Sequence, residues 1–130
     1  MGALTELFAP ERVAVVGATE SEGSVGRAVM ANLTAEFTGE VVPVNPNYDE
    51  VMGLPCVASV AEADAVVAVV VVPPAVAVDV VREAGEAGVR SVVVITAGFS
   101  ETGSEGAARE RELAAVAEEY DLDLVGPNSL

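Results

Sequence analysis

A glycine-rich segment near the N-terminus could hold a phosphate group. It reads Gly-Ala-Thr-Glu-Ser-Glu-Gly-Ser-Val-Gly from Gly17 to Gly26 and directly follows a short β-branched run. Glycines let the backbone approach a ligand closely, and a helix that begins after them offers free N–H groups and the positive end of its dipole. The spacing is not G-x-G-x-x-G, because Thr19 replaces the second glycine and the loop is longer. A tight connection without a ligand is therefore the alternative. The candidate contacts are Gly17, Ala18, Thr19, Glu20, Ser21, Glu22, Gly23, Ser24, Val25, Gly26 and Arg27, of which Arg27 is the only basic residue.

The residues at the end of the second apolar run help to decide whether the ligand is a nicotinamide dinucleotide. A dinucleotide-binding fold places Asp or Glu at this strand tip for the ribose hydroxyls. Here residues 43–47 read Pro-Val-Asn-Pro-Asn, with no acid at the tip. This disfavours NAD. Asn45 and Pro46 also suit a turn, and that role is compatible with ligand contact by Asn45, Pro46 and Asn47.

These segments belong to a regular alternation of predicted strands and helices. β-branched runs bounded by glycine or proline predict buried strands, and apolar residues at helical spacing predict helices. We expect strands at 12–17, 40–45, 65–72, 91–95 and 123–125, helices at 23–37, 75–85 and 107–120, one helical turn at 60–63, and a loop around 48–55.

The alternation predicts an α/β fold, a Rossmann-like doubly wound parallel sheet of about five strands with helices on both faces. The expected strand order is 3-2-1-4-5. Ligands of such sheets bind beyond the carboxyl ends of the strands, where the order reverses. The segments that follow Val16, Val44, Val72, Ile95 and Val125 are therefore expected to line the ligand edge.

The composition excludes several classes of function. The 130 residues carry a formal net charge of −15 with no His and one cysteine, Cys56. Nucleic acids and anionic membrane surfaces are disfavoured as partners, because both require clustered cations. Without His there is no His-based catalysis or His-ligated metal site. A lone cysteine in a loop is interpreted as a packed residue. The N-terminus lacks a basic signal-peptide region, and prolines interrupt the longest apolar run, 65–78. Both features favour a cytoplasmic protein.

The acidic residues are spread along the chain, and all basic residues are Arg. Their mutual repulsion destabilises a compact state at low ionic strength, and molar salt removes most of it. This pattern predicts a halophilic source; an ordinary acidic domain is the alternative.

Short motifs follow one another in chain order on the predicted strand ends. They are Leu-Phe-x-Pro-x-Arg-Val-Ala-Val-Val-Gly-Ala at 7–18, Pro-Val-Asn-Pro at 43–46, Glu-Val-x-Gly at 50–53, Val-Val-Pro at 71–73, Ile-Thr-Ala-Gly-Phe at 95–99 and Gly-Pro-Asn at 126–128. Together they resemble the N-terminal CoA-binding domain of NDP-forming acyl-CoA synthetases. This group includes ADP-forming acetyl-CoA synthetase and is related to the succinyl-CoA synthetase α subunit. The resemblance covers nearly the whole chain.

The resemblance implies that CoA lies across the carboxyl ends of the strands. By position, residues 19–22 correspond to the family's first CoA loop, and Asn47 to a basic contact that is often Lys in relatives. A third contact segment matches Ile95, Thr96 and Ala97, and the ligand is flanked by Val72, Pro73 and Asn128. The chain departs from the family pattern at Asn47, and at Ser129 where the family has Cys.

The resemblance also implies a place in a larger enzyme that converts an acid, CoA and ATP into acyl-CoA, ADP and phosphate. The phosphohistidine and ATP-grasp domains or subunits of that enzyme are the expected partners. Residues 1–130 are then one CoA-binding domain, expected to be a fragment of a larger multidomain enzyme and inactive alone, since they contain no His. The alternatives are a CoA-binding module fused to a protein acetyltransferase and a Rossmann domain for a nicotinamide dinucleotide.

Overall fold

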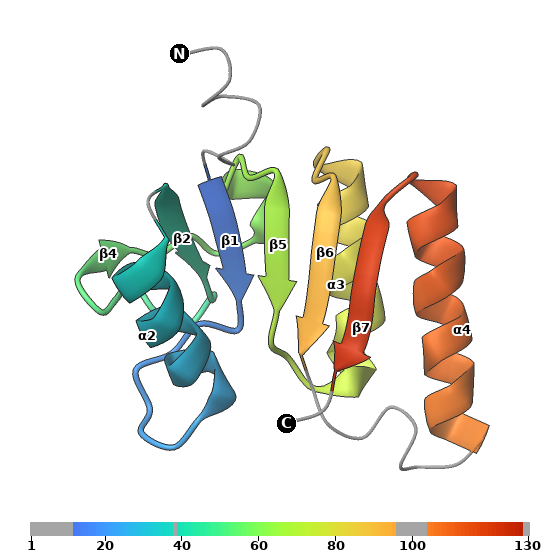
Figure 1. The fold of residues 1–130 in the computed structure, drawn as a ribbon, viewed down its shortest axis with the longest axis horizontal. Helices are drawn as coiled ribbons and strands as arrows, with labels where there is room; N and C mark the ends of the chain where they lie inside the picture. Colours follow the sequence, from blue (N-terminus) through green and yellow to red (C-terminus); the bar gives the residue numbers. More distant parts are fainter. Residues whose placement is uncertain (1–11, 38, 96–103, 129–130) are drawn as a thin grey trace.

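A computed structural model describes residues 12–37, 39–95 and 104–128 (Figure 1). In these ranges the predicted strands and helices are all present, and their ends shift by only a few residues. The elements are β1 (Arg12–Val16), α2 (Val25–Glu36), β2 (Glu40–Val44), β3 (Glu50–Val51), β4 (Leu54–Pro55), the 3-10 helix η1 (Val60–Glu62), β5 (Val67–Val70), α3 (Pro74–Glu86), β6 (Ser91–Ile95), α4 (Ser104–Glu119) and β7 (Asp123–Asn128).

Five parallel strands form the main sheet, in the order β2-β1-β5-β6-β7. The predicted Rossmann-like α/β fold is confirmed. The predicted strand order 3-2-1-4-5 is wrong: the third parallel strand, β5, pairs with β1, so the order along the chain is 2-1-3-4-5.

The segment after β2 also differs from the prediction. The sequence predicts a loop there, and the structure has a short antiparallel hairpin, β3–β4. Its turn residues Met52 and Gly53 have φ angles of 51° and 80°. Two-residue hairpin turns often need positive φ at both positions, and a Met gives no signal for that conformation. After the hairpin, Val57 makes a single parallel bridge to Val44. Val57 thus lies at the outer edge of β2, where the predicted order places the third strand, while β5 pairs with the other edge of β1.

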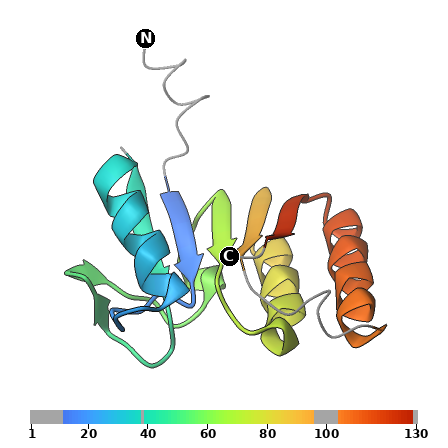
Figure 2. The ribbon, with the colours of Figure 1, turned by 60° about the horizontal axis from the view of Figure 1, so that its bottom comes forward.

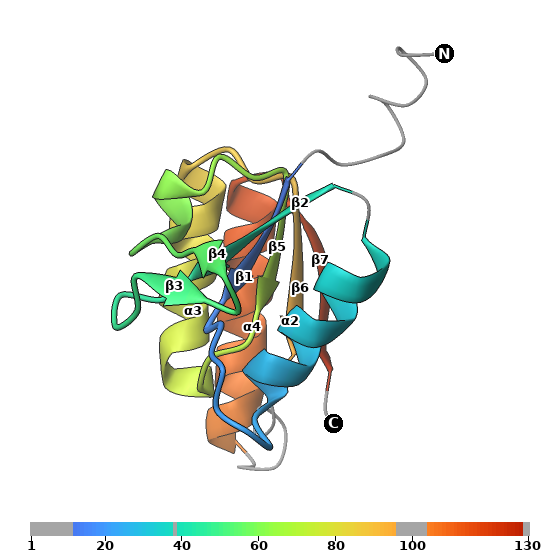
Figure 3. The same cartoon turned by 90° about the vertical axis from the view of Figure 1, so that its left-hand side faces the viewer.

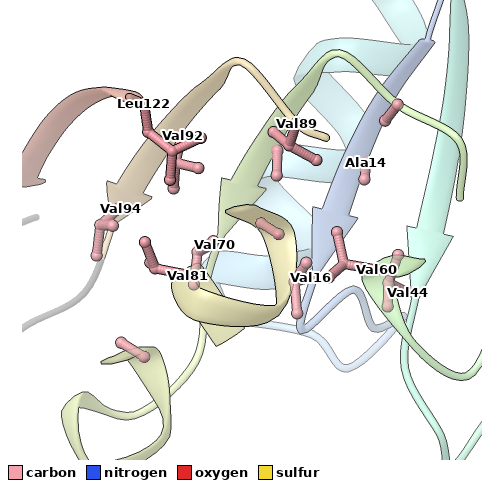
Figure 4. Packing of buried hydrophobic residues seen from close by; sticks show 14 of the residues in the cluster. Ala14, Val16, Val44, Val60, Val70, Val81, Val89, Val92, Val94 and Leu122 are labelled. Carbon is pink, nitrogen blue, oxygen red and sulfur yellow. The ribbon is translucent and has the colours of Figure 1, made fainter. Parts of the chain in front are cut away.

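Helices cover the two faces of the sheet (Figure 3), with α2 on one face and α3 and α4 on the other. Under α2, Val15, Met30 and Val51 are fully buried. The larger cluster lies under α3, α4 and η1 and includes Val70 and Val92 (Figure 4). Near-continuous burial of Val and Ala is typical of parallel strands covered on both faces.

The sheet has a switch point between β1 and β5. The chain leaves β1 through α2 on one face of the sheet, and it leaves β5 through α3 on the other face (Figure 3). Ligands of such sheets bind at the carboxyl ends of the strands around this point, here β1, β2 and β5. Figure 2 brings this edge forward. Within the described ranges, no helix has the length and apolar character needed to cross a membrane.

Candidate functional site

A cleft of about 530 Å³ lies at the carboxyl ends of β1, β2 and β5. Pockets of roughly 300–1,000 Å³ are typical of small-molecule sites. The cleft is lined by Val16, Gly17, Thr19, Val44, Asn45, Pro46, Asn47, Tyr48, Ala58, Ser59, Val60, Val71, Val72, Pro73, Val76, Val80 and Glu83.

Gly17 forms the floor between three strand ends. Its N–H donates to the Val44 carbonyl at 2.9 Å, so the turn after β1 is tied to β2. Its φ angle is +92°, and a Cβ at this position would lie 2.0 Å from the Val71 carbonyl oxygen, after β5. Only glycine fits both the conformation and the space.

The rest of the loop folds against the N-terminus of α2. Ser24 is the N-cap, where its hydroxyl accepts from the Arg27 N–H at 3.2 Å and donates to the Ser21 carbonyl at 2.7 Å. The Thr19 hydroxyl accepts from the Ser21 N–H and donates to the Ser21 hydroxyl, both at 3.1 Å. This network holds the loop next to the unpaired N–H groups of the first helical turn, which is the arrangement that binds anions.

Gly26 brings α2 close to this loop. A Cβ on Gly26 would lie 2.5 Å from the Gly17 carbonyl oxygen and 3.0 Å from Cγ2 of Thr19. The glycine therefore serves the contact between helix and loop, as the third glycine of a dinucleotide-binding fingerprint does.

Asn45 joins the loops that follow β1 and β2. Its Nδ2 donates to the Ala18 carbonyl at 3.0 Å, and its Oδ1 accepts from the Asn47 N–H at 2.9 Å. The second bond closes the turn that the sequence predicts, and the first fixes the glycine loop from the neighbouring strand. Both ends of the amide are used inside the protein.

We expect Asn45→Ala to lower the free energy of unfolding by about 2 kcal/mol, because two hydrogen bonds worth about 1 kcal/mol each are lost. Asn45→Ser is the matched control: its shorter hydroxyl suits the turn but not the bond to Ala18. Urea unfolding in KCl should rank the serine variant between the alanine variant and the parent chain. Equal stability of the alanine variant and the parent would show that the link is unimportant.

The cleft has a polar rim and an apolar wall. On the rim, the hydroxyls of Thr19 and Tyr48 lie 3.3 Å apart and connect the two loops. On the α3 side, Val72, Val76 and Val80 form the wall, and Val76 is 45% exposed. An apolar surface with a few polar groups is typical of a pocket for an organic ligand.

Charges at the cleft are few. Glu83 lines it, and its Oε1 accepts from the Val60 N–H at 3.1 Å, which ties α3 to η1. Nη1 of Arg27 lies 3.6 Å from Oε1 of Glu22; the Glu22 side chain is largely in solvent and that of Arg27 is 42% exposed. Exposed pairs of this kind are weak, so Arg27 can exchange Glu22 for an anionic ligand.

The structure brings together part of the predicted site. The predicted residues that line the cleft are Gly17, Thr19, Asn45, Pro46, Asn47, Val72 and Pro73. Ala18 is buried; Glu20, Ser21, Glu22 and Gly23 are exposed; and Ser24, Val25, Gly26 and Arg27 form the cap and first turn of α2. Ile95 and Asn128 pair with each other at the ends of β6 and β7, outside the lining of this cleft, and Thr96 and Ala97 lie outside the described residues.

Sequence analysis missed the wall from η1 and α3. Val76, Val80 and Glu83 stand at helical spacing after Pro73, on the element that leaves the ligand edge. That spacing gives one side of the helix, but only the position of β5 beside β1 directs this side to the cleft.

Two further site types find no support in the described ranges. No group of three or more His, Cys, Asp or Glu residues there could hold a metal ion. Cys56 donates its thiol to the Asn45 carbonyl at 3.5 Å, and burial, with a smaller contribution from Asp49, raises the pKa of the thiol. A raised pKa opposes thiolate formation, which agrees with a packed cysteine.

Comparison with known proteins gives a consistent result. Residues 11–130 match a family described as CoA binding domain. The chain is 48% identical over 129 residues to acetate–CoA ligase (ADP-forming) I of Archaeoglobus fulgidus, covering 98% of this chain and 19% of that protein. A Pyrococcus horikoshii OT3 structure superposes with a TM-score of 0.87 at 39% identity, covering 96% of this chain and 29% of that one. An acetyl-coenzyme A synthetase of Candidatus Korarchaeum cryptofilum, solved with phosphate and ADP, gives a TM-score of 0.85 at 40% identity, covering 98% and 28%.

The chain thus spans about a fifth of the length of the Archaeoglobus ligase, 19%. The family match extends over almost all of the sequence, including the glycine loop and the strand ends that form the cleft. The chain therefore belongs to the family of CoA-binding domains, and its relatives include ADP-forming acetate–CoA ligases.

Proposed function

We propose that this chain binds coenzyme A in the cleft, as the CoA-binding domain of an ADP-forming acyl-CoA synthetase. The observation that carries the proposal is the cleft of about 530 Å³ at the switch point of the sheet, built on a glycine loop, in a chain of the CoA-binding family. CoA is then a substrate of the enzyme rather than a cofactor. Acetate is the first candidate acid, because relatives are named acetate–CoA ligases.

The cleft and the helix end next to it suit the two parts of CoA. The glycine loop lines the cleft at Gly17 and Thr19, and it leads into the N-terminus of α2, which offers backbone N–H groups and a dipole to the pyrophosphate. The wall of Val72, Val76 and Val80 offers apolar contact to the uncharged part of the molecule. The role of this chain in the reaction is to bind and orient CoA.

Asn45 opposes the nicotinamide alternative. A ribose diol needs an acceptor at the tip of the second strand, usually a carboxylate. Asn45 holds that position, and its amide is bonded to Ala18 and Asn47.

Ligand choice tests the proposal directly. Isothermal titration in KCl should show CoA binding at least tenfold tighter than NADH, since the strand tip offers no carboxylate to the diol. Val76→Asp should weaken CoA binding about tenfold by placing a charge in the apolar wall. Val66→Asp is the matched control, because Val66 is 39% exposed and precedes β5 at the amino end of the strand. Tighter binding of NADH than of CoA would reject the proposal.

The remaining steps are proposed for partner domains or subunits of the phosphohistidine and ATP-grasp types. The 130-residue chain contains no His to accept a phosphoryl group. We expect no ADP formation from ATP, acetate and CoA with the purified chain in a coupled assay. Turnover above the rate of a cleft variant such as Val76→Asp would contradict this assignment. A cytoplasmic location and a halophilic source stay predictions.

A further inference from the structure

We infer that the cleft does not recognise the 3′-phosphate of CoA, so that it takes 3′-dephospho-CoA at least as readily as CoA. The inference rests on the proposed function, because it concerns the same cleft. It specifies which phosphates of the ligand the protein binds.

The distribution of cations carries the argument. The six basic residues of the sequence are Arg12, Arg27, Arg82, Arg90, Arg109 and Arg111, and all six lie in the described ranges. None of them lines the cleft.

Most of these arginines lie on other parts of the fold. Arg12 begins β1, at the opposite end of the sheet, where it pairs with Glu40 at 3.4 Å and Asp64 at 3.6 Å. Arg90 precedes β6 at the same amino edge. Arg82 points from α3 to Glu119 of α4, at 3.3 Å. Arg109 and Arg111 are on α4, which packs against α3 and β7 rather than β1 or β2.

Among the six arginines, all within the described ranges, Arg27 is the one near the glycine loop, in the first turn of α2. That turn is where the loop and the helix dipole favour the pyrophosphate. A guanidinium held there cannot also neutralise a second phosphate on the ribose without leaving the first. The 3′-phosphate is therefore left without an ion pair.

Position 47 also offers no positive charge to a phosphate. The Asn47 N–H bonds to Asn45, the side chain is exposed, and the residue lines the cleft. The nearby charges are negative: Asp49 and Glu50 follow in sequence, and Glu83 lines the cleft. A phosphomonoester adds a charge of about −1.5 to −2 at neutral pH, which this environment repels.

Two titrations test the inference. CoA and 3′-dephospho-CoA are titrated by calorimetry into the parent chain in KCl. We expect affinities within about threefold of each other, with dephospho-CoA the tighter ligand at the lowest usable salt. CoA binding ten times tighter than dephospho-CoA would overturn the inference, because it would require a group that reads the 3′-phosphate.

A gain of function sharpens the test. Asn47→Lys adds a cation on an exposed turn and removes no hydrogen bond of the asparagine side chain among the described contacts. It should tighten CoA about tenfold and change dephospho-CoA by less than about twofold, since a charge-assisted bond forms only with the 3′-phosphate. Asn32→Lys, on the exposed part of α2, adds the same charge and controls for net charge.

The outcomes are distinct. Equal tightening of both ligands by Asn47→Lys would contradict the expectation that the 3′-phosphate lies beside position 47, because the new cation would then act on the shared pyrophosphate; the inference itself is overturned by a parent chain that prefers CoA tenfold. Failure of both ligands to bind the parent chain would overturn the proposed function and the inference with it. Selective tightening of CoA supports both.

Discussion

Gly17→Ala is expected to lower the free energy of unfolding by about 2–5 kcal/mol and to weaken CoA binding at least a hundredfold. An alanine held at positive φ costs about 1–2 kcal/mol, and overpacking adds about 1–3 kcal/mol. Here φ is +92°, and the new Cβ would lie 2.0 Å from the Val71 carbonyl oxygen. The backbone must move apart at the point where β1, β2 and β5 form the floor of the cleft, so binding is lost together with stability.

Alanine substitutions at two other glycines serve as controls, because they introduce the strain of positive φ without the steric clash at Gly17. Gly88 has φ +89° and Gly23 has φ +80°, and a Cβ on either would meet nothing within 4 Å. Gly88→Ala should cost about 1–2 kcal/mol and leave CoA affinity unchanged, because Gly88 lies between α3 and β6, at the far end of the sheet. Gly23→Ala introduces the same backbone strain inside the glycine-rich loop, so its unfolding free energy gives the cost of that strain at the site.

The measurements are urea unfolding and calorimetric titration of CoA, both in KCl. Should Gly17→Ala prove too unstable to titrate, its unfolding midpoint against that of Gly88→Ala still tests the collision. Equal midpoints for the two variants would show that the close approach of Gly17 to Val71 does not constrain this fold.

The fold class could be predicted because each element has a strong local signal. The β-branched runs ending at Gly17 and Pro73 give strands, and the prolines at 73 and 74 give the start of α3. Strand order has no such local signal. It depends on pairing between segments far apart in the chain, such as β1 with β5. The hairpin after β2 was missed for a local reason: the residue type at Met52 does not indicate positive φ.

The candidate site, like the fold, could be predicted from the sequence only in part. Gly17, Asn45 and Val72 could be placed at the cleft because strand ends meet at one edge in any doubly wound sheet. The inner contacts could not be predicted. That Val76 and Val80 form a wall depends on the pairing of β5 with β1, which the predicted strand order lacks. The bond from Asn45 to Ala18 depends on the side-chain geometry of the turn after β2, which the residue type alone does not specify.

The protein and CoA are both negatively charged, so the affinity for CoA should depend strongly on salt concentration. The chain carries −15 and CoA about −4 at neutral pH, so their long-range repulsion weakens binding at low ionic strength. The phosphate contacts available are backbone N–H groups, the α2 dipole and Arg27. Such short contacts are screened less than repulsion between distant charges.

KCl should therefore tighten CoA binding, by about tenfold between roughly 0.15 M and 1 M, where the Debye length falls from about 8 Å to 3 Å. A phosphate site lined by lysines shows the opposite trend. Salt also stabilises an acidic fold, so affinity must be compared only where circular dichroism shows full folding. Dephospho-CoA provides an internal control: with less charge to repel, its affinity should rise less steeply with KCl than that of CoA. A steady loss of CoA affinity with KCl across the folded range would mean that direct ion pairs dominate, and that the cation-poor cleft described here is not where the phosphates bind.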